Sequence, residues 1–153
     1  MKPAVLFVCL GNICRSPMAE GAFRAAADEA GLDIIVDSAG TGDWHIGNAP
    51  DPRAQKEAAS HGVSIAHLRG RQIGEDDYRK FSHIFALDKD NLAIIQQRAP
   101  EDTTAEISLL MDVVEGERGR PVADPYYGGA EGFTQTWCDV SKAARALVDR
   151  FSR

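Results

Sequence analysis

The sequence predicts an α/β protein in which a central parallel sheet of about four strands is flanked by helices. Short apolar runs alternate along the chain with stretches of helical spacing, as in right-handed strand–helix–strand units. The first run, residues 4–9 (AVLFVC), has no polar position and is typical of a strand buried on both faces. The 153 residues show no repeat and no linker, so residues 1–153 are expected to form one domain.

The first helix is predicted over residues 16–30, directly after a short loop. Ser16 suits the N-cap position, and Pro17 suits the first helical position. Gly31 is typical of the residue that ends a helix. The chain therefore begins as strand, tight loop and helix.

The rest of the chain repeats this alternation. In order, we expect a strand over 33–38, a helix from 51 to about 62, a short helix over 74–80, a strand over 83–87, a helix over 88–98, a strand over 105–110, irregular structure over 111–124 and a long helix over 132–151. The strands are short and largely apolar. Asp51, followed by Pro52, and Asp88 are typical of helix starts, and an apolar stripe runs along the last helix.

The composition limits the partners and the compartment. Lys and Arg number 17 against 23 Asp and Glu, and this net charge of −6 argues against nucleic acid as a partner. The three cysteines, Cys9, Cys14 and Cys138, are too few for a disulfide scaffold and favour a reducing cytoplasm. The longest apolar run, residues 4–10, is too short to span a membrane and is followed by no signal-peptide cleavage site, so no membrane partner is expected.

The loop between the first strand and the first helix carries the chemistry. Such a loop precedes a helix N-terminus, whose free N–H groups and dipole bind anions. Gly11 permits the positive φ that a tight loop needs, and Asn12 tolerates it. Arg15 can grip two phosphate oxygens, Cys9 can act as a nucleophile, and Ser16 can donate to its thiolate. The pattern Cys-x5-Arg-Ser predicts covalent attack on the phosphorus of a phosphate ester; the alternative is an inert, buried Cys9.

The loop matches neither of two nucleotide-binding motifs, and phosphoryl transfer to a thiol also needs a proton donor for the leaving group. No Gly-Lys-Ser/Thr closes the loop and no G-x-G-x-x-G is present, which excludes a Walker-type NTPase and a dinucleotide fingerprint. Asp124, within residues 124–127 (DPYY), is the best candidate for the acid that protonates the leaving group. Asp-Pro also begins plain turns, and the sequence alone favours that interpretation.

With these residues, the sequence resembles the low-molecular-weight protein tyrosine phosphatases from residue 4 to the C-terminal helix. The matches are residues 8–20 (VCLGNICRSPMAE), 37–40 (DSAG), 43–44 (DW), 50–54 (PDPRA), 71–73 (RQI) and 124–127 (DPYY). The resemblance implies a three-layer fold with a four-stranded sheet. It also implies hydrolysis of phosphotyrosine in proteins and of small aryl phosphates without metal or cofactor, with inorganic phosphate as product and competitive inhibitor. We expect a monomer.

The resemblance also implies a role for each catalytic residue. Cys9 forms a phosphocysteine intermediate, and Arg15 binds the phosphoryl oxygens. Asp124 protonates the leaving phenol and then activates water. Asn12 holds the loop, and Ser16 bonds the thiolate.

Residues around the loop complete the implied site. Ser38 is expected to support the loop through Asn12, and His67 and Asp88 to form a pair behind it. The implied walls of a slot for a phenyl ring are Leu10, Trp44, Tyr126 and Tyr127. The other residues expected to bind the substrate are Gly11, Asn12, Ile13, Cys14 and His45. Aromatic and apolar walls favour an aryl phosphate over phosphoserine. The charged residues within 69–77 are expected to form a solvated face.

Several interpretations stay open at this point. Cys14 can form a reversible disulfide with Cys9 or contribute only its backbone amide. An arginine phosphatase of the same family is an alternative activity, although such relatives tend to carry Thr where Ile13 stands. A thiol-dependent arsenate reductase would need two more cysteines near residues 70–90, which the chain lacks, and a non-catalytic phosphate-binding module would lack the catalytic residues.

Overall fold

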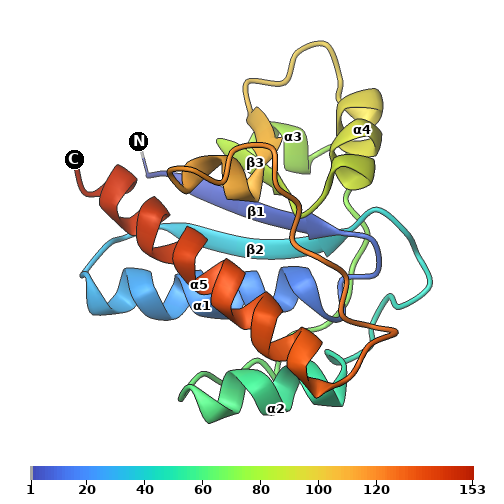
Figure 1. Cartoon of the computed structure of the whole chain (residues 1–153). Helices are drawn as coiled ribbons and strands as arrows, with labels where there is room; N and C mark the ends of the chain where they lie inside the picture. The colour runs from blue at the N-terminus through green and yellow to red at the C-terminus, as the bar shows by residue number, and fades with distance from the viewer. Residues whose placement is uncertain (1) are drawn as a thin grey trace.

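A four-stranded parallel sheet forms the centre of the protein, as predicted (Figure 1). The structure is a computed structural model that describes residues 2–153. The sheet has the strand order β2-β1-β3-β4. Its strands are β1 (Ala4–Cys9), β2 (Ile35–Gly40), β3 (His83–Ala86) and β4 (Glu106–Leu109).

Helices cover both faces of this sheet. The helices α1 (Arg15–Glu29), α2 (Pro52–Ser60) and α5 (Ala130–Phe151) lie on one side in Figure 1, and α3 (Asp77–Lys80) and α4 (Lys89–Arg98) lie on the other. A short 3-10 helix, Leu110–Val113, follows β4, and it includes the last residue of the strand predicted over 105–110 and the first three residues of the segment predicted to be irregular. Within residues 2–153, no helix is both long enough and apolar enough to cross a membrane.

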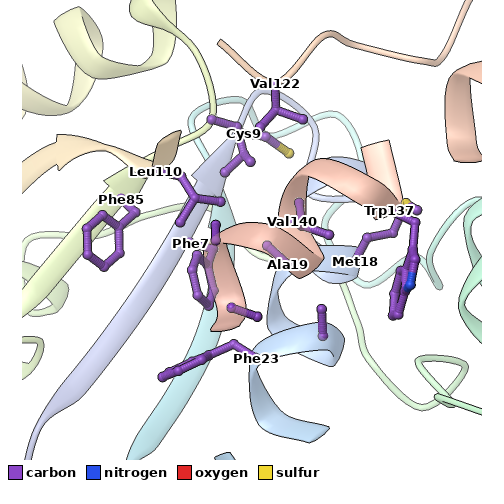
Figure 2. Packing of buried hydrophobic residues seen from close by; sticks show 14 of the residues in the cluster. Phe7, Cys9, Met18, Ala19, Phe23, Phe85, Leu110, Val122, Trp137 and Val140 are labelled. Carbon is purple, nitrogen blue, oxygen red and sulfur yellow. The ribbon is translucent and has the colours of Figure 1, made fainter. Parts of the chain in front are cut away.

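Strand β1 divides the core into two layers because its side chains alternate between the two faces. Phe7 and Cys9 belong to the cluster that packs under α1 and α5, whereas Leu6 and Val8 belong to the cluster under α3 and α4. Phe7 packs edge-on against Phe23 of α1, with ring centroids 5.9 Å apart (Figure 2). This packing fixes the direction in which the Cys9 side chain leaves the end of β1.

The start of α1 differs from the prediction. The helix begins at Arg15 with Cys14 as its N-cap, and no side chain caps it. Ser16 is therefore not the N-cap and Pro17 is the third helical residue, because the Ser16 hydroxyl bonds the side chains of Cys9 and Asn12 instead. Gly31, with φ of 72°, follows the helix end as expected.

Other boundaries shift by a few residues. Strand β2 starts two residues later than predicted and continues to Gly40, whose backbone pairs with Gln72. Helix α3 is shorter than expected and α5 begins earlier, at Ala130. The predicted helix starts at Asp51 and Asp88 are confirmed, because each side chain accepts a hydrogen bond from a backbone N–H of its own first turn.

Candidate active site

A hollow of about 310 Å³ opens at the carboxyl end of β1, where the chain turns into α1. The structure brings together here most of the residues that the sequence singled out. The residues that line the hollow are Cys9, Leu10, Gly11, Ile13, Cys14, Arg15, Trp44, His45, Asp124, Tyr126 and Tyr127. They come from three segments: the chain from the last residue of β1 to the first residue of α1, the loop after β2 and the loop before α5.

The Cys9 sulfur lies at the base of this hollow and has two close polar neighbours. Its Sγ is 3.0 Å from Ser16 Oγ and accepts a hydrogen bond of 3.3 Å from the Asn12 backbone N–H. Ser16 Oγ itself accepts a hydrogen bond of 2.7 Å from Asn12 Nδ2, so its hydroxyl hydrogen can be donated either to the sulfur or, over 3.4 Å, to the Ala39 carbonyl. Both neighbours can therefore stabilise negative charge on Sγ.

Asn12 fixes the curl of the loop, and it corrects one prediction. Asn12, not Gly11, has the positive φ, of 57°. Asparagine adopts this conformation when its side chain bonds nearby groups. Besides Ser16, its Nδ2 donates to Ser38 Oγ at 3.0 Å, and its Oδ1 accepts from the Arg71 backbone N–H at 3.0 Å. The expected contact of Ser38 with Asn12 is present.

Two residues of this network were missed or misread from the sequence. Glu20 is buried on α1, accepts a hydrogen bond of 2.8 Å from Ser38 Oγ and pairs with Arg24 at 2.7 Å. A carboxylate inside the apolar face of the first helix was the available signal. Arg71 is half-buried and pairs with Asp37 and with the buried Asp77, so Arg71 and Asp77 are not part of the solvated face predicted within residues 69–77.

Arg15 is buried behind the loop and held by three oxygens. Its Nη1 donates to Asp88 Oδ2 at 2.7 Å and to the Val122 carbonyl at 3.0 Å, while its Nη2 lies 3.7 Å from Asp124 Oδ2. Burial alone would lower the pKa of Arg15, but the neighbouring Cys9, Asp88 and Asp124 raise it above its ordinary value. A fixed positive charge therefore stands beside the Cys9 sulfur.

The predicted pair of His67 and Asp88 is wrong. His67 is exposed and borders a different hollow, together with Glu20 and Arg24. Both oxygens of Asp88 are engaged elsewhere, one by Arg15 and the other by the Asn91 N–H at the start of α4. Asp88 does lie behind the loop, as expected, but it holds the arginine and not a histidine.

Cys14 lies beside the hollow as a buried, free thiol, like Cys9. Burial raises the pKa of Cys14 well above its usual range, and the nearby Asp51, Cys9 and Asp124 raise it further. The Cys14 thiol is therefore protonated at neutral pH, when it is a poor nucleophile. A reversible disulfide between Cys9 and Cys14 stays a prediction.

The mouth of the hollow is apolar and exposed. Leu10, Trp44, Tyr126 and Tyr127 are large apolar side chains that are exposed at the surface, with Tyr127 at 93%. The two tyrosine rings meet edge to face at 4.9 Å, and the Arg53 guanidinium lies 5.4 Å from the Tyr126 ring centre. Such walls can bury the faces of a flat apolar group that enters the hollow.

Asp124 begins a turn, and its role as a proton donor stays a prediction. Its Oδ1 accepts a hydrogen bond of 3.1 Å from the Tyr126 N–H, as a residue that begins a turn does. Its side chain, 42% exposed, also borders the hollow and faces Arg15. The turn thus places a partly solvated carboxyl group in the lining of the hollow that also contains the Cys9 thiol. Within residues 2–153, no group of three or more His, Cys, Asp and Glu side chains is placed to hold a metal ion.

An anion-binding loop with a thiol at its base and aromatic walls at its mouth defines a class of site, and comparison with known proteins gives the family. The family model of low molecular weight phosphotyrosine protein phosphatases matches residues 4–153. A relative of that name from Schizosaccharomyces pombe is 45% identical over 132 residues, 84% of each chain. The chain therefore belongs to the low molecular weight phosphotyrosine protein phosphatase family.

Solved structures agree with this assignment. The crystal structure of a protein tyrosine phosphatase from Entamoeba histolytica is 35% identical, with a TM-score of 0.93 over 99% of this chain and 97% of that one. A Drosophila arginine phosphatase is 32% identical, with a TM-score of 0.92 over 100% of this chain and 99% of that one. Proteins of this fold and of similar sequence thus include one named a protein tyrosine phosphatase and one named an arginine phosphatase.

Gly40 allows β2 to approach the loop, so its replacement should disturb the site. A Cβ at Gly40 would lie 2.8 Å from the Leu10 carbonyl oxygen and 3.3 Å from the Asn12 backbone nitrogen. We expect Gly40→Ala to lower the free energy of unfolding by about 1–3 kcal/mol and to weaken binding of inorganic phosphate. Urea denaturation and phosphate titration measure both effects. Gly74→Ala, where a Cβ meets nothing within 4 Å, is the matched control and should change neither.

Proposed function

We propose that this protein hydrolyses phosphotyrosine in proteins, and small aryl phosphates, through a phosphocysteine intermediate on Cys9 and without a metal ion. The observation that carries the proposal is the position of the Cys9 sulfur. It lies at the base of a hollow with an apolar mouth, and the buried Arg15 and Asp124 line the same hollow. Membership of a phosphotyrosine protein phosphatase family supports the same conclusion.

In the first step, the Cys9 thiolate attacks phosphorus and the bond between phosphorus and the phenolic oxygen breaks. Asp124, in its protonated form, gives its proton to that leaving oxygen. In the second step, Asp124 takes a proton from water, whose oxygen attacks the phosphocysteine. The sulfur–phosphorus bond then breaks, inorganic phosphate leaves, and the Ser16 hydroxyl, 3.0 Å from Sγ, stabilises the departing thiolate.

The phosphoryl group needs positive charge, although the whole chain has a net charge of −6. Arg15 and the backbone N–H groups before α1 supply it locally, and the helix dipole adds to it. Because these groups are held by the fold, they stabilise the charge of the transition state with little reorganisation. Inorganic phosphate fits the same groups, so it should inhibit competitively.

The apolar mouth decides the class of substrate. Trp44, Tyr126 and Tyr127 line the same hollow as the loop, so a phenyl ring attached to a phosphate on the loop would contact them. Burying an aromatic ring between such walls is favourable, whereas phosphoserine offers no ring to bury.

We also propose that the protein works as a monomer in the cytoplasm, where its free thiols would stay reduced.

Hydrolysis of phosphoarginine is the second candidate. It is supported by the 32% identity to a Drosophila arginine phosphatase. Ile13 argues for phosphotyrosine, because it adds an apolar side chain to the hollow where arginine phosphatases tend to carry Thr.

One assay separates these activities. Peptides of one sequence carrying phosphotyrosine, phosphoarginine or phosphoserine are compared, with and without a metal chelator. We expect kcat/KM to be at least about 10-fold higher for phosphotyrosine, the size of a typical pocket preference, and to be unaffected by chelator. Faster release of phosphate from phosphoarginine would favour the second candidate, and loss of activity with chelator would contradict the mechanism.

A further inference from the structure

Trp44 in the pocket wall packs against a residue two places earlier in the chain, Gly42. A Cβ atom built on Gly42 would lie within 2.9 Å of three atoms of the Trp44 six-membered ring, Cε3, Cζ3 and Cη2. Non-bonded carbon atoms prefer separations of about 3.5–4.0 Å. The indole therefore lies directly on the Gly42 backbone, in space that any side chain at position 42 would fill.

The backbone itself does not require glycine at this position. The φ angle of Gly42 is outside the left-handed region, unlike that of Gly47 a few residues later. An alanine at position 42 would therefore meet no backbone strain. What glycine provides here is space for the Trp44 ring, not conformational freedom.

The loop on both sides of Trp44 is held in place, so the side chain is the part that can respond. Upstream, the Gly42 N–H donates to the Leu10 carbonyl at 2.9 Å. Downstream, the Asn48 N–H donates to the His45 carbonyl at 3.0 Å, and the Asn48 carbonyl accepts from the Gly70 N–H at 2.8 Å. A Cβ at position 42 would therefore move the indole rather than the loop.

We infer that Gly42 is a specificity-determining position, which holds the Trp44 indole in the wall of the pocket and so sets the affinity for an aryl ring. This inference rests on the proposed function, because the ring of the substrate is what Trp44 would contact. Gly42 does not touch the phosphoryl group. Its replacement should therefore change recognition of the ring and leave the loop around Cys9 unaltered.

The kinetic test uses Gly42→Ala with 4-nitrophenyl phosphate as substrate. We expect KM to rise roughly 3- to 10-fold, the value of one aromatic contact, at an unchanged kcat. The inhibition constant of inorganic phosphate, which has no ring, should stay the same. If kcat and the phosphate constant change together with KM, Gly42 shapes the phosphate loop and the inference is wrong. An unchanged KM would also overturn it.

A double-mutant cycle tests the route through Trp44. Trp44→Ala removes the ring, so adding Gly42→Ala to it should have no further effect on KM. An equal effect of Gly42→Ala in both backgrounds would overturn the inference. Gly74→Ala serves as the control for adding a methyl group in open space.

Fluorescence tests the inference independently of the reaction. The chain has two tryptophans, Trp44 at 68% exposed and Trp137 at 7%. In a Trp137→Phe background, Gly42→Ala should increase quenching of Trp44 by acrylamide, because one face of the indole loses its cover. No change in quenching would contradict the inference. This signal needs no substrate, so it remains valid if the assay of phosphorylated peptides contradicts the proposed function.

Discussion

Replacing Cys9 by serine should abolish hydrolysis of aryl phosphates. The serine hydroxyl is slightly smaller than the thiol and stays protonated at neutral pH, so it cannot attack phosphorus at a useful rate. We expect kcat to fall by roughly 10⁴-fold or more, the usual size of the loss when a nucleophile is removed. Release of phosphate from 4-nitrophenyl phosphate measures the effect.

Binding should survive this substitution, and that distinguishes a lost nucleophile from a lost fold. Arg15 and the loop N–H groups are unchanged in Cys9→Ser, so inorganic phosphate should still raise the unfolding temperature. Cys138→Ser is the matched control, because Cys138 is an exposed thiol on α5 far along the chain, and it should keep full activity. Retention of more than a few per cent of the activity by Cys9→Ser would exclude the phosphocysteine mechanism.

The position of the site could be predicted because its determinants are local. The pattern of apolar residues predicts both the buried strand that ends at Cys9 and the helix that follows it. A loop between such elements faces the carboxyl edge of a parallel sheet whatever its detailed conformation. Cys9, Arg15 and the residues between them therefore had to lie together.

The conformation of the loop could not be predicted because distant residues determine it. The positive φ falls on Asn12 rather than on Gly11, and the bonds that stabilise it come from Ser38 and Arg71. Those residues lie 26 and 59 positions away in the sequence. The general preference of glycine for positive φ was outweighed by these contacts.

The same cause explains the error at the start of α1. Ser16 has a strong preference for the N-cap position, but its hydroxyl bonds Cys9 and Asn12 in the site. The helix then begins without a side-chain cap, so unpaired N–H groups stay available for an anion. The N-cap preference of serine fails here because Ser16 serves the site. Local rules often fail at functional residues.

His67 and Glu20 show a limit of the family resemblance. The resemblance placed His67 behind the loop, yet in this structure the buried partner of Ser38 is Glu20, with Arg24 beside it. Burial of a carboxylate is costly unless it is paired, and Arg24, one helical turn away on α1, supplies the pair. Residue roles carried over from a family still need the contacts of the individual chain.

Asp124→Asn should slow the reaction in a way that depends on the leaving group. Asparagine keeps the shape of the side chain and can still accept the Tyr126 N–H bond through its amide oxygen, but it cannot supply or remove a proton. For phenyl phosphate, whose leaving group is a strong base, we expect kcat/KM to fall by about 10²–10⁴-fold. For 4-nitrophenyl phosphate the fall should be much smaller, because that phenolate leaves without a proton.

The comparison of the two substrates separates acid catalysis from a loss of charge beside Arg15. Asp124 Oδ2 lies 3.7 Å from Arg15 Nη2, so Asp124→Asn also removes an ion pair. Without that pair Arg15 should bind phosphate more tightly, which affects both substrates alike. Asp90→Asn is the control. Asp90 and Asp124 both line a neighbouring hollow, but Asp90 does not line the hollow that contains Cys9. An equal change in kcat/KM for both substrates would show that Asp124 acts through its charge alone, and an unchanged rate for phenyl phosphate would remove Asp124 from the reaction.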